Sequence, residues 1–469
     1  MTTTSRILSL SAAAICCAAS LTSAQQVASA RTSGADDSSA APEAAAPAPK
    51  KAKAPLVRAI DMQYFRAQDQ RGVNVFETPK EPGAAFDGFR LSWGAAFLQT
   101  FQGLDHRNSA QPVMKKDANN KDYNANELVK IGNGFDNASA NLYLNAQLAP
   151  GIRVALTTYL SSRHHNETWV KDGFLLIDES PIDFIPLNTL MKYVTVRAGH
   201  FEVNYGDAHF RRTDNGNSIY NPFVGNLLMD AFTTEIGAEV YARAKGLMVM
   251  GAVTGGEIKG NVTTPQDRKP AYLGKLGVDR QLTPTLRARL TGSYYQSASS
   301  PANTLFAGDR AGSPYFFVLE NTQATSTAQA QSGTINPGLR QHVTAFQVNP
   351  FVKLYGLELF GVAERAKGTS AGEKVDRAWN QYAGEAIYRF AAREQLYVAG
   401  RYNTARGALA GIAPKVGADR MQMGAGWYVT PTVLLKGEYV NQKFNDFPST
   451  DIRSGGKFDG FMVAGVVAF

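Results

Sequence analysis

The chain has 469 residues, with 48 Lys and Arg against 40 Asp and Glu, a net charge of +8 and a hydrophobic fraction of 44%. No uninterrupted apolar run reaches the ~18 residues of a membrane-spanning helix, so the composition excludes a helical membrane protein. It does not exclude a β-protein with one strand face in lipid, because alternation hides such a face from any average.

The N-terminus has the pattern of a secretory signal peptide. Arg6 precedes an apolar stretch over residues 7–21, and small residues surround Ala24. This pattern predicts a signal peptide over residues 1–24, cleaved after Ala24. Because Cys16 and Cys17 are the only cysteines and both lie within it, we expect the mature chain to contain no thiol, disulfide or Cys-ligated metal.

The next segment, residues 25–55, is dominated by Ala, Ser and Pro, with three lysines near its end. It has too few large apolar residues to offset the entropy of ordering, and we expect a disordered periplasmic linker. Residues 56–85 carry scattered aromatic residues such as Phe65 and Phe76. They are compatible with a short N-terminal periplasmic segment or with a plug.

From residue 86 to residue 469 the dominant signal is alternation of apolar and polar residues, which indicates strands with two unlike faces. In residues 138–148, for example, Leu142 and Leu144 alternate with Asn141, Tyr143 and Asn145. The pattern predicts sixteen strands, at 86–103, 135–148, 151–163, 167–178, 193–203, 231–242, 246–255, 270–281, 286–297, 340–350, 355–365, 378–390, 395–405, 419–429, 432–443 and 456–469.

These strands predict an all-β fold, a closed antiparallel transmembrane β-barrel with short turns at one end and long loops at the other. The alternative is a soluble all-β protein such as a propeller or a sandwich. Soluble strands average about five or six residues, roughly half the length seen here, which favours the membrane barrel.

The C-terminal segment FMVAGVVAF, with Phe461, Val463, Val467 and Phe469 on one face, resembles the terminal signature of outer-membrane β-barrel proteins. The alternation of tight turns and long loops over residues 86–469 resembles bacterial porins, including the phosphate-selective type. The resemblance implies the outer membrane of a Gram-negative bacterium and recognition by the barrel assembly machinery. It also implies contacts with outer-membrane lipid and lipopolysaccharide, and a homotrimer.

A barrel of about sixteen strands encloses an aqueous lumen. We therefore expect a porin for passive diffusion of small hydrophilic solutes and ions, with a mild preference for phosphate-like anions; the alternative is a surface adhesin or a loop-based hydrolase. The sequence has no nucleophile-elbow, zinc-protease or phosphate-loop motif, and its basic residues are spread over many strands. We expect no enzymatic activity, cofactor, metal or nucleic-acid partner.

The third long loop, residues 204–230, contains Arg211, Arg212, Asp207 and Asp214 and an apolar stretch over 223–229. By resemblance to general porins, it would fold into the lumen and form the constriction. The apolar stretch would then pack against the wall while Arg211 and Arg212 face the channel. Two alternatives stay open: a solvated surface loop, or inward folding of a longer loop, 104–134 or 298–339, instead.

Strand parity places further charged residues on the lumen face, because an unpaired charge in lipid costs a few kcal/mol near the midplane. The candidates are Arg153, Arg197, Arg287, Arg289, Arg401, Glu235 and Glu239. Phosphate-selective porins have an arginine ladder and a lysine-rich sink, whereas lysines are few in these strands and acids are interspersed. This departure favours a general or weakly anion-selective pore.

Overall fold

The computed structural model describes residues 65–78, 80, 86, 88–136, 138–162, 167–259, 262–325 and 331–469. The predicted signal peptide and linker, over residues 1–55, lie outside the described residues, as do residues 56–64. The structural account therefore concerns the barrel region and the short segment that precedes it.

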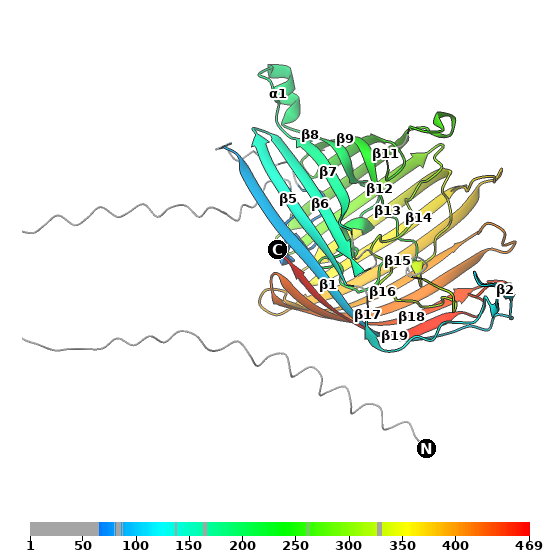
Figure 1. Cartoon of the computed structure of the whole chain (residues 1–469). Coiled ribbons are helices and arrows are strands. Elements are labelled where there is room, and N and C mark those ends of the chain that lie inside the picture. Colours follow the sequence, from blue (N-terminus) through cyan, green and yellow to red (C-terminus); the bar gives the residue numbers. More distant parts are fainter. Residues whose placement is uncertain are drawn as a thin grey trace, which may run out of the picture. The chain divides into compact units, whose positions relative to one another are not determined.

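Sixteen long antiparallel strands close into a barrel (Figure 1), which confirms the predicted fold class and the predicted number of strands. The strands are β1 (Arg90–Arg107), β5 (Ser139–Ala149), β6 (Ile152–Ser161), β7 (Trp169–Ile177), β8 (Val194–Glu202), β9 (Thr234–Ala244), β10 (Leu247–Thr254), β11 (Ala271–Thr283), β12 (Leu286–Ser297), β13 (His342–Leu354), β14 (Leu357–Thr369), β15 (Arg377–Phe390), β16 (Leu396–Gly407), β17 (Val416–Thr430), β18 (Val433–Asn445) and β19 (Lys457–Ala468).

Closure of the barrel depends on β1, which pairs with β5 on one side and with the last strand, β19, on the other. Its first half pairs with β5, from Arg90 opposite Gln147 to Leu98 opposite Ser139. Its second half pairs with β19, and Phe97 lies opposite Val467. Every neighbouring pair of strands is antiparallel. Because the pairing of β1 with β19 closes the ring, the sheet has no free edge and its backbone groups are satisfied within it.

The other short strands and the α-helix lie at the two ends of the barrel. They are β2 (Met114–Lys116), β3 (Asp122–Asn124), β4 (Gly134–Phe135) and α1 (Ile185–Met191). Within the described ranges, three short 3₁₀-helices, η1 (Gln70–Gly72), η3 (Ala208–Arg211) and η4 (Pro265–Asp267), lie outside the strands. The strands β2 and β3 form a separate hairpin at the loop end, and β4 pairs with β1. No helix among the described residues is long and apolar enough to cross a membrane.

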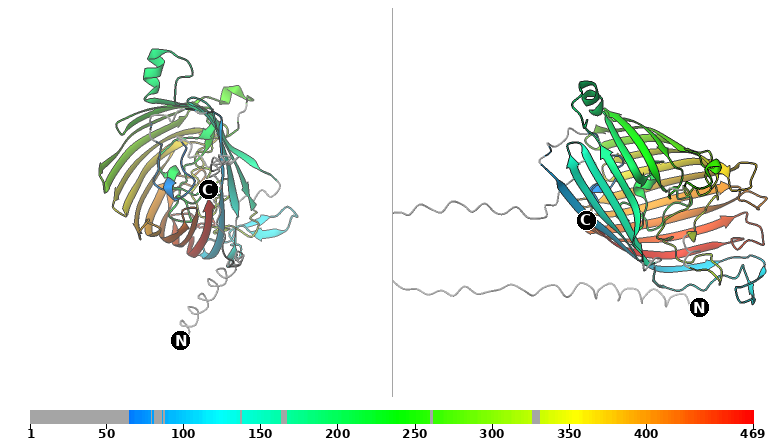
Figure 2. Two further views of the ribbon diagram at one scale, coloured as in Figure 1. Left: turned by 90° about the vertical axis from the view of Figure 1, so that its left-hand side faces the viewer. Right: turned by 45° about the horizontal axis from the view of Figure 1, so that its top comes forward.

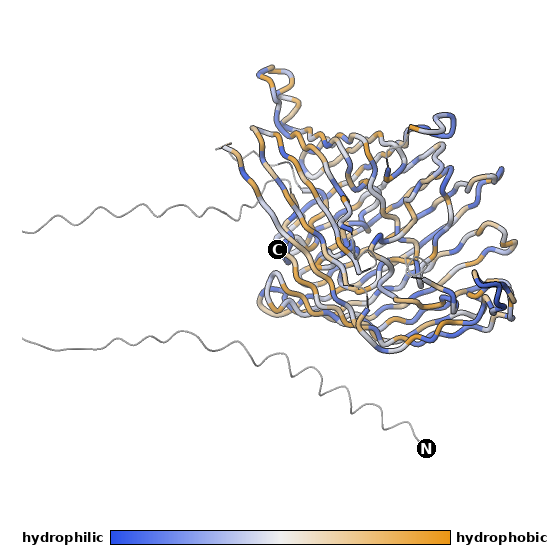
Figure 3. Tube along the Cα trace, in the orientation of Figure 1, coloured by the Kyte–Doolittle hydropathy of each residue, from blue (hydrophilic) through white to orange (hydrophobic). Residues whose placement is uncertain are grey.

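The two faces of the strands follow the predicted parity. Leu142 and Leu144 face outward and are 45% and 43% exposed, whereas the neighbouring Asn141 and Gln147 face the lumen and are buried. Figure 3 shows the same alternation of apolar and polar residues along the strands. The outer surface is thus an apolar band and the inner surface is polar, as a bilayer requires.

The two ends of the barrel differ in their connections. At one end, most strands are joined by tight turns such as Lys245–Gly246, where both residues have a positive φ that glycine adopts at no steric cost. The exception is the connection from β7 to β8, which carries α1 and projects from the barrel (Figure 1). The opposite end carries the long loops.

The apolar core lies inside the barrel. Two long connections, residues 203–233 and the described residues 298–325 and 331–341, run within the ring of strands (Figure 2, left) and bury apolar side chains such as Phe223, Leu228 and Tyr315 against the wall. Residues 65–78 also lie in the lumen, where Phe76 is buried. The interior is therefore a packed layer of loops with cavities around it.

Candidate functional site

The third long loop, residues 203–233, folds into the lumen and is almost entirely buried. Its backbone binds carboxamide side chains of the wall: Leu228 N donates to Asn403 Oδ1 at 2.6 Å, and Met229 N donates to Gln381 Oε1 at 2.8 Å. Glu438 of β18 accepts hydrogen bonds from Val224 N at 2.7 Å. The wall of β15–β18 thus satisfies the backbone of an otherwise irregular segment.

Basic residues of the same wall hold the carbonyl groups of this loop. Lys436 Nζ donates to three of them, at 2.7–2.9 Å. Arg420 Nη1 donates to Asn226 O at 2.6 Å, and Arg401 Nη1 donates to Gly225 O at 2.9 Å. These inward-facing cations therefore anchor the loop and do not line an open channel.

The two adjacent arginines of the loop were expected to face the channel, but the structure buries both. Arg211 and Arg212 are 3% and 5% exposed. Arg211 lies 3.3 Å from Glu385 and 3.7 Å from Glu358, two acids of the wall. Because a desolvated guanidinium is stable only when paired, these wall carboxylates draw Arg211 away from the lumen water.

Arg212 forms a two-point ion pair with Asp230, its Nε and Nη2 lying 2.8 and 2.6 Å from the two carboxylate oxygens. Asp309 of the second inward loop lies 3.4 Å from the same guanidinium. Arg212 still reaches the edge of the cavity described below.

Asp207 lies at the centre of a buried charge cluster at the start of the loop. It is 2.8 Å from Lys275 of β11 and 2.8 Å from Arg289 of β12, and it also accepts a hydrogen bond from Thr291. Burial alone would raise the pKa of Asp207, but the two cations outweigh burial and hold it below its ordinary value. Asp207 therefore stays ionised and fixes the loop to β11 and β12.

The second inward loop, described over residues 298–325 and 331–341, packs against the first. Tyr315 OH donates to Glu438 at 2.6 Å, and Asp309 accepts a hydrogen bond from Asn215 N at 2.9 Å. The sequence left open that a longer loop folds inward in place of residues 204–230. In the structure the third loop and the second inward loop both fold inward. Much of loop 104–134, by contrast, is exposed around its β2–β3 hairpin.

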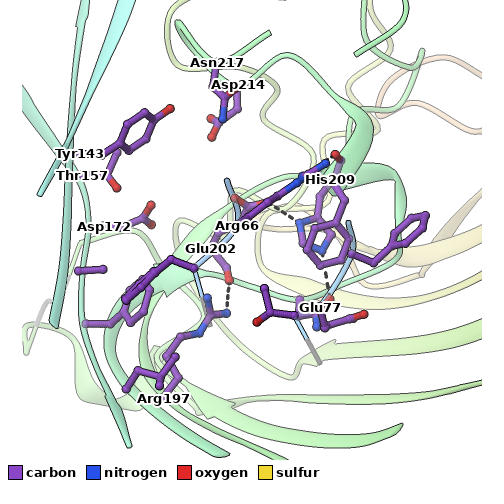
Figure 4. Close-up of a pocket in the computed structure, with 18 of the residues that line it drawn as sticks. Arg66, Glu77, Tyr143, Thr157, Asp172, Arg197, Glu202, His209, Asp214 and Asn217 are labelled. Atoms are coloured by element: carbon purple, nitrogen blue, oxygen red, sulfur yellow. Dashed lines mark hydrogen bonds and ion pairs between the residues drawn. The ribbon is translucent and has the colours of Figure 1, made fainter. Parts of the chain in front are cut away.

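A cavity of about 260 Å³ remains between the third loop, residues 65–78 and the wall of β5–β9. Figure 4 shows Tyr143, Thr157 and Asp172 on one side of it, opposite Arg66 and His209. Its charged lining residues are Arg66, Lys171, Arg197, Arg212 and Arg243, with Glu77, Asp172, Glu202 and Asp214. Five basic groups and four carboxylates therefore line one cavity.

Two of these charged residues, Lys171 and Asp172, are neighbours in sequence and yet both face the lumen. They can do so because the pairing between β6 and β7 shifts register. Thr157 lies opposite Asp172, but the next residue, Thr158, lies opposite Val170. The shift leaves Lys171 as an extra residue, and both Lys171 and Asp172 are buried on the lumen side. Simple alternation would send one of them into lipid, so parity could not identify this pair.

The lumen charges on β7 and β8 pair with neighbouring groups. Lys171 forms ion pairs with Asp214 of the loop and, at 3.8 Å, with Glu202. Arg197 lies 2.5 Å from Glu239. Burial raises the pKa of Asp214 to about 6, an effect that Lys171 only partly offsets. The protonation of Asp214 is thus sensitive to pH near neutrality.

Of the eleven predicted site residues, three line this cavity: Arg197, Arg212 and Asp214. The others lie elsewhere in the lumen and are paired: Arg153 with Asp178 at 2.5 Å, Arg287 with Asp279 at 2.6 Å, Arg401 with Glu385 at 2.8 Å and Glu235 with Tyr295 at 2.7 Å, while Glu239, Asp207, Arg289 and Arg211 pair as described above. Whether any of them governs the passage of solutes stays a prediction.

Sequence reasoning missed Arg66, Glu77, Glu202 and His209 as cavity residues. Glu202 ends β8, and its carboxylate accepts from His209 Nδ1 at 2.5 Å. Glu202 lies five residues after Arg197 and therefore has the opposite parity, so alternation alone did not identify it. No group of three or more potential metal ligands occurs within the described residues.

No protein-family model and no curated protein matches the sequence. Among solved structures, a loop L8 deletion mutant of OmpT, an outer membrane protein of Vibrio cholerae, is 9% identical, with a TM-score of 0.47 over 82% of this chain and 100% of that one. An anion-selective porin from Comamonas acidovorans is 11% identical, with a TM-score of 0.47 over 81% and 100% of the two chains. OprB from Pseudomonas putida is 12% identical, with a TM-score of 0.46 over 81% and 94%.

The architecture itself defines the class of protein. A closed barrel with an even number of antiparallel strands, an apolar outer band, short turns at one end and long loops at the other is an outer-membrane β-barrel. Sixteen strands enclose an interior too wide for the side chains of the wall alone to fill, and here charged loops fold into it.

Proposed function

We propose that the protein is a diffusion pore for small hydrophilic solutes and ions. The observation that carries this proposal is the polar, charge-lined cavity along β5–β9, inside a barrel whose outer surface is apolar. The third loop is fixed to the opposite wall by Lys436, Arg420 and Arg401. Solutes would therefore pass on the β5–β9 side, where the loop leaves space.

The pore would prefer anions only weakly. Five basic groups against four acids leave the described lining of the cavity with a small positive excess. Most arginines that would form a ladder are engaged in ion pairs, as Arg153 is with Asp178 and Arg289 with Asp207. A narrow tube of low dielectric amplifies a small excess of charge, so we expect mild anion selectivity and no strong phosphate site.

Planar bilayer recordings on the purified protein test this proposal. A pore gives stepwise conductance, with a reversal potential in a KCl gradient displaced slightly toward that of chloride. Absence of conductance at every applied voltage would contradict the pore and would favour the alternative of a surface adhesin or loop-based hydrolase. A reversal potential on the cation side would contradict the anion preference alone.

The same proposal places the barrel as a homotrimer in the outer membrane, in contact with lipid and lipopolysaccharide, with the linker in the periplasm. Phe461 and Val463 on the outer face of β19, and Phe469 directly after it, are exposed and support recognition of the barrel by the assembly machinery. Cross-linking in native outer membranes, followed by electrophoresis, tests the trimer. A single monomeric band would contradict it.

A further inference from the structure

Residues 65–78 form no strand of the barrel, yet they are held inside it close to the short-turn end. Gln70 N donates to Pro431 O at 2.8 Å, and Gln70 Nε2 donates to Arg393 O at 3.0 Å. Pro431 and Arg393 belong to the turns that join β17 to β18 and β15 to β16. The segment is therefore attached to the rim where the turns lie.

Further into the lumen, the segment inserts an aromatic residue and an adjacent acid into a matching site. Phe76 is buried and meets the rings of Phe351 and Phe210 edge to face, with centroids 5.3 and 5.8 Å away. Glu77 lies 2.8 Å from Lys275 and 2.6 Å from Arg289. These two cations also bind Asp207, so the third loop and the segment share one basic site.

The middle of the segment is also bound through its polar groups. Asn74 Nδ2 donates to Glu358 at 2.5 Å, and Asn74 O accepts from Arg287 Nη1 at 2.9 Å. Arg66 donates to Phe210 O at 2.8 Å and stacks on the ring of Tyr220 at 3.5 Å. Wall strands and third loop thus contribute specific partners along the whole segment.

We propose that residues 65–78 are a built-in plug, and that the lumen contains a peptide-binding site for which this segment is the ligand. The site recognises a peptide with an aromatic residue next to an acid, through the Phe351–Phe210 pocket and the Lys275–Arg289 pair. Phe65, Phe76, Glu77 and Thr78 line the cavity, so the plug narrows the route that solutes would take. This inference rests on the proposed pore function.

Single-channel recordings on a variant lacking residues 65–78 test the plug. The control lacks residues 30–43, a deletion of equal length in the predicted linker. We expect the first deletion to raise the conductance about twofold or more, because the passage widens, and the control to match the wild type. Equal conductance in all three proteins would overturn the plug, whereas absence of conductance in all three would contradict the pore instead.

A synthetic peptide of residues 65–78, added to the deletion variant from the short-turn side, tests recognition. It should restore the lower conductance, and a peptide with Glu77→Lys should need about tenfold higher concentration because Lys275 and Arg289 repel it. Equal block by the two peptides would overturn the peptide-binding site.

If the deletion variant does not fold, the full-length variant Phe76→Ala with Glu77→Gln replaces it. It removes the aromatic insertion and the charge but keeps the chain length. Conductance above that of the wild type would support the plug, and wild-type conductance would overturn it.

Discussion

The two sides of the lumen use the same kind of residue for different purposes. On the β15–β18 side, inward-facing cations such as Lys436 and Arg420 bind loop carbonyls. On the β5–β9 side, Lys171 and Arg197 pair with neighbouring acids around a cavity of about 260 Å³. An inward-facing charged residue thus holds the third loop where the loop lies against the wall, and lines the cavity where it does not.

This difference has an energetic cause. Carbonyl groups of an irregular loop need donors when they are buried, and the β15–β18 wall supplies them from long basic side chains and carboxamides. The β5–β9 wall presents small inward residues such as Ala155 and Thr157 beside large ones such as Arg197, and the loop does not fill the space in front of them. Variants on the two sides should therefore affect stability and conduction separately.

The largest effect is expected from Asp207→Asn on the scaffold side. It removes the carboxylate between Lys275 and Arg289, and breaking a buried ion pair costs about 3–5 kcal/mol. Urea unfolding of the protein in lipid vesicles measures this cost. The matched control is Asp105→Asn, which changes an exposed carboxyl on β1; a loss for Asp207→Asn no larger than for the control would contradict the scaffold role.

Lys436→Met should have the next largest effect. Three carbonyl groups of the loop lose a charged donor, which we expect to lower the free energy of unfolding by about 2–3 kcal/mol and to make the open-channel current noisier as the loop loosens. The control is Lys443→Met, an exposed position of the same strand. A quiet current with wild-type stability would show that the loop is held without Lys436.

On the cavity side, Lys171→Gln should change selectivity. Removing one positive charge from the lining should lower the ratio of anion to cation permeability about twofold, as read from reversal potentials in a salt gradient. Lys192→Gln, at an exposed position before β8, serves as the control. An unchanged ratio in Lys171→Gln would indicate that ions do not pass along this wall.

The smallest expected effect is a pH dependence of selectivity. Because burial raises the pKa of Asp214 to about 6 from its ordinary 3.8, this carboxyl takes up a proton as the pH falls from 7 to 5. The cavity then loses a negative charge, and the anion preference should rise. Reversal potentials across this pH range measure the change, which should disappear in Asp214→Asn; persistence of the same slope would assign it to another group.

The sequence was sufficient for the barrel, since strand parity is a local property. A strand between lipid and water must alternate apolar and polar side chains. This requirement acts on each pair of residues adjacent in sequence, as at Leu142 and Asn141. The same argument placed Arg153, Glu235 and Arg401 on the inner face, where they are buried. Parity also directs the aromatic residues Tyr159, Phe201 and Tyr241 into the lumen, where they are buried.

The candidate site depended on contacts that no local pattern contains. Parity gives the face of a charge but not its partner, and the partner of Arg211 lies 174 residues away in Glu385. The register shift at Thr157 and Thr158, which brings both Lys171 and Asp172 inward, arises from pairing between two strands. Because such contacts are not encoded in a local pattern, the sequence predicted only three of the charged residues that line the cavity.

What the sequence determined by itself is the alternation that a bilayer imposes, and with it the sixteen strands, their two faces and the short-turn and long-loop ends. What only the tertiary structure decided is how the interior is filled, because three segments share one lumen: residues 203–233, 65–78 and the described part of the second inward loop (298–325 and 331–341). Their positions follow from buried polar groups that must find partners across the barrel, such as Glu77 with Lys275. That requirement is non-local, so it appears only once the barrel is closed.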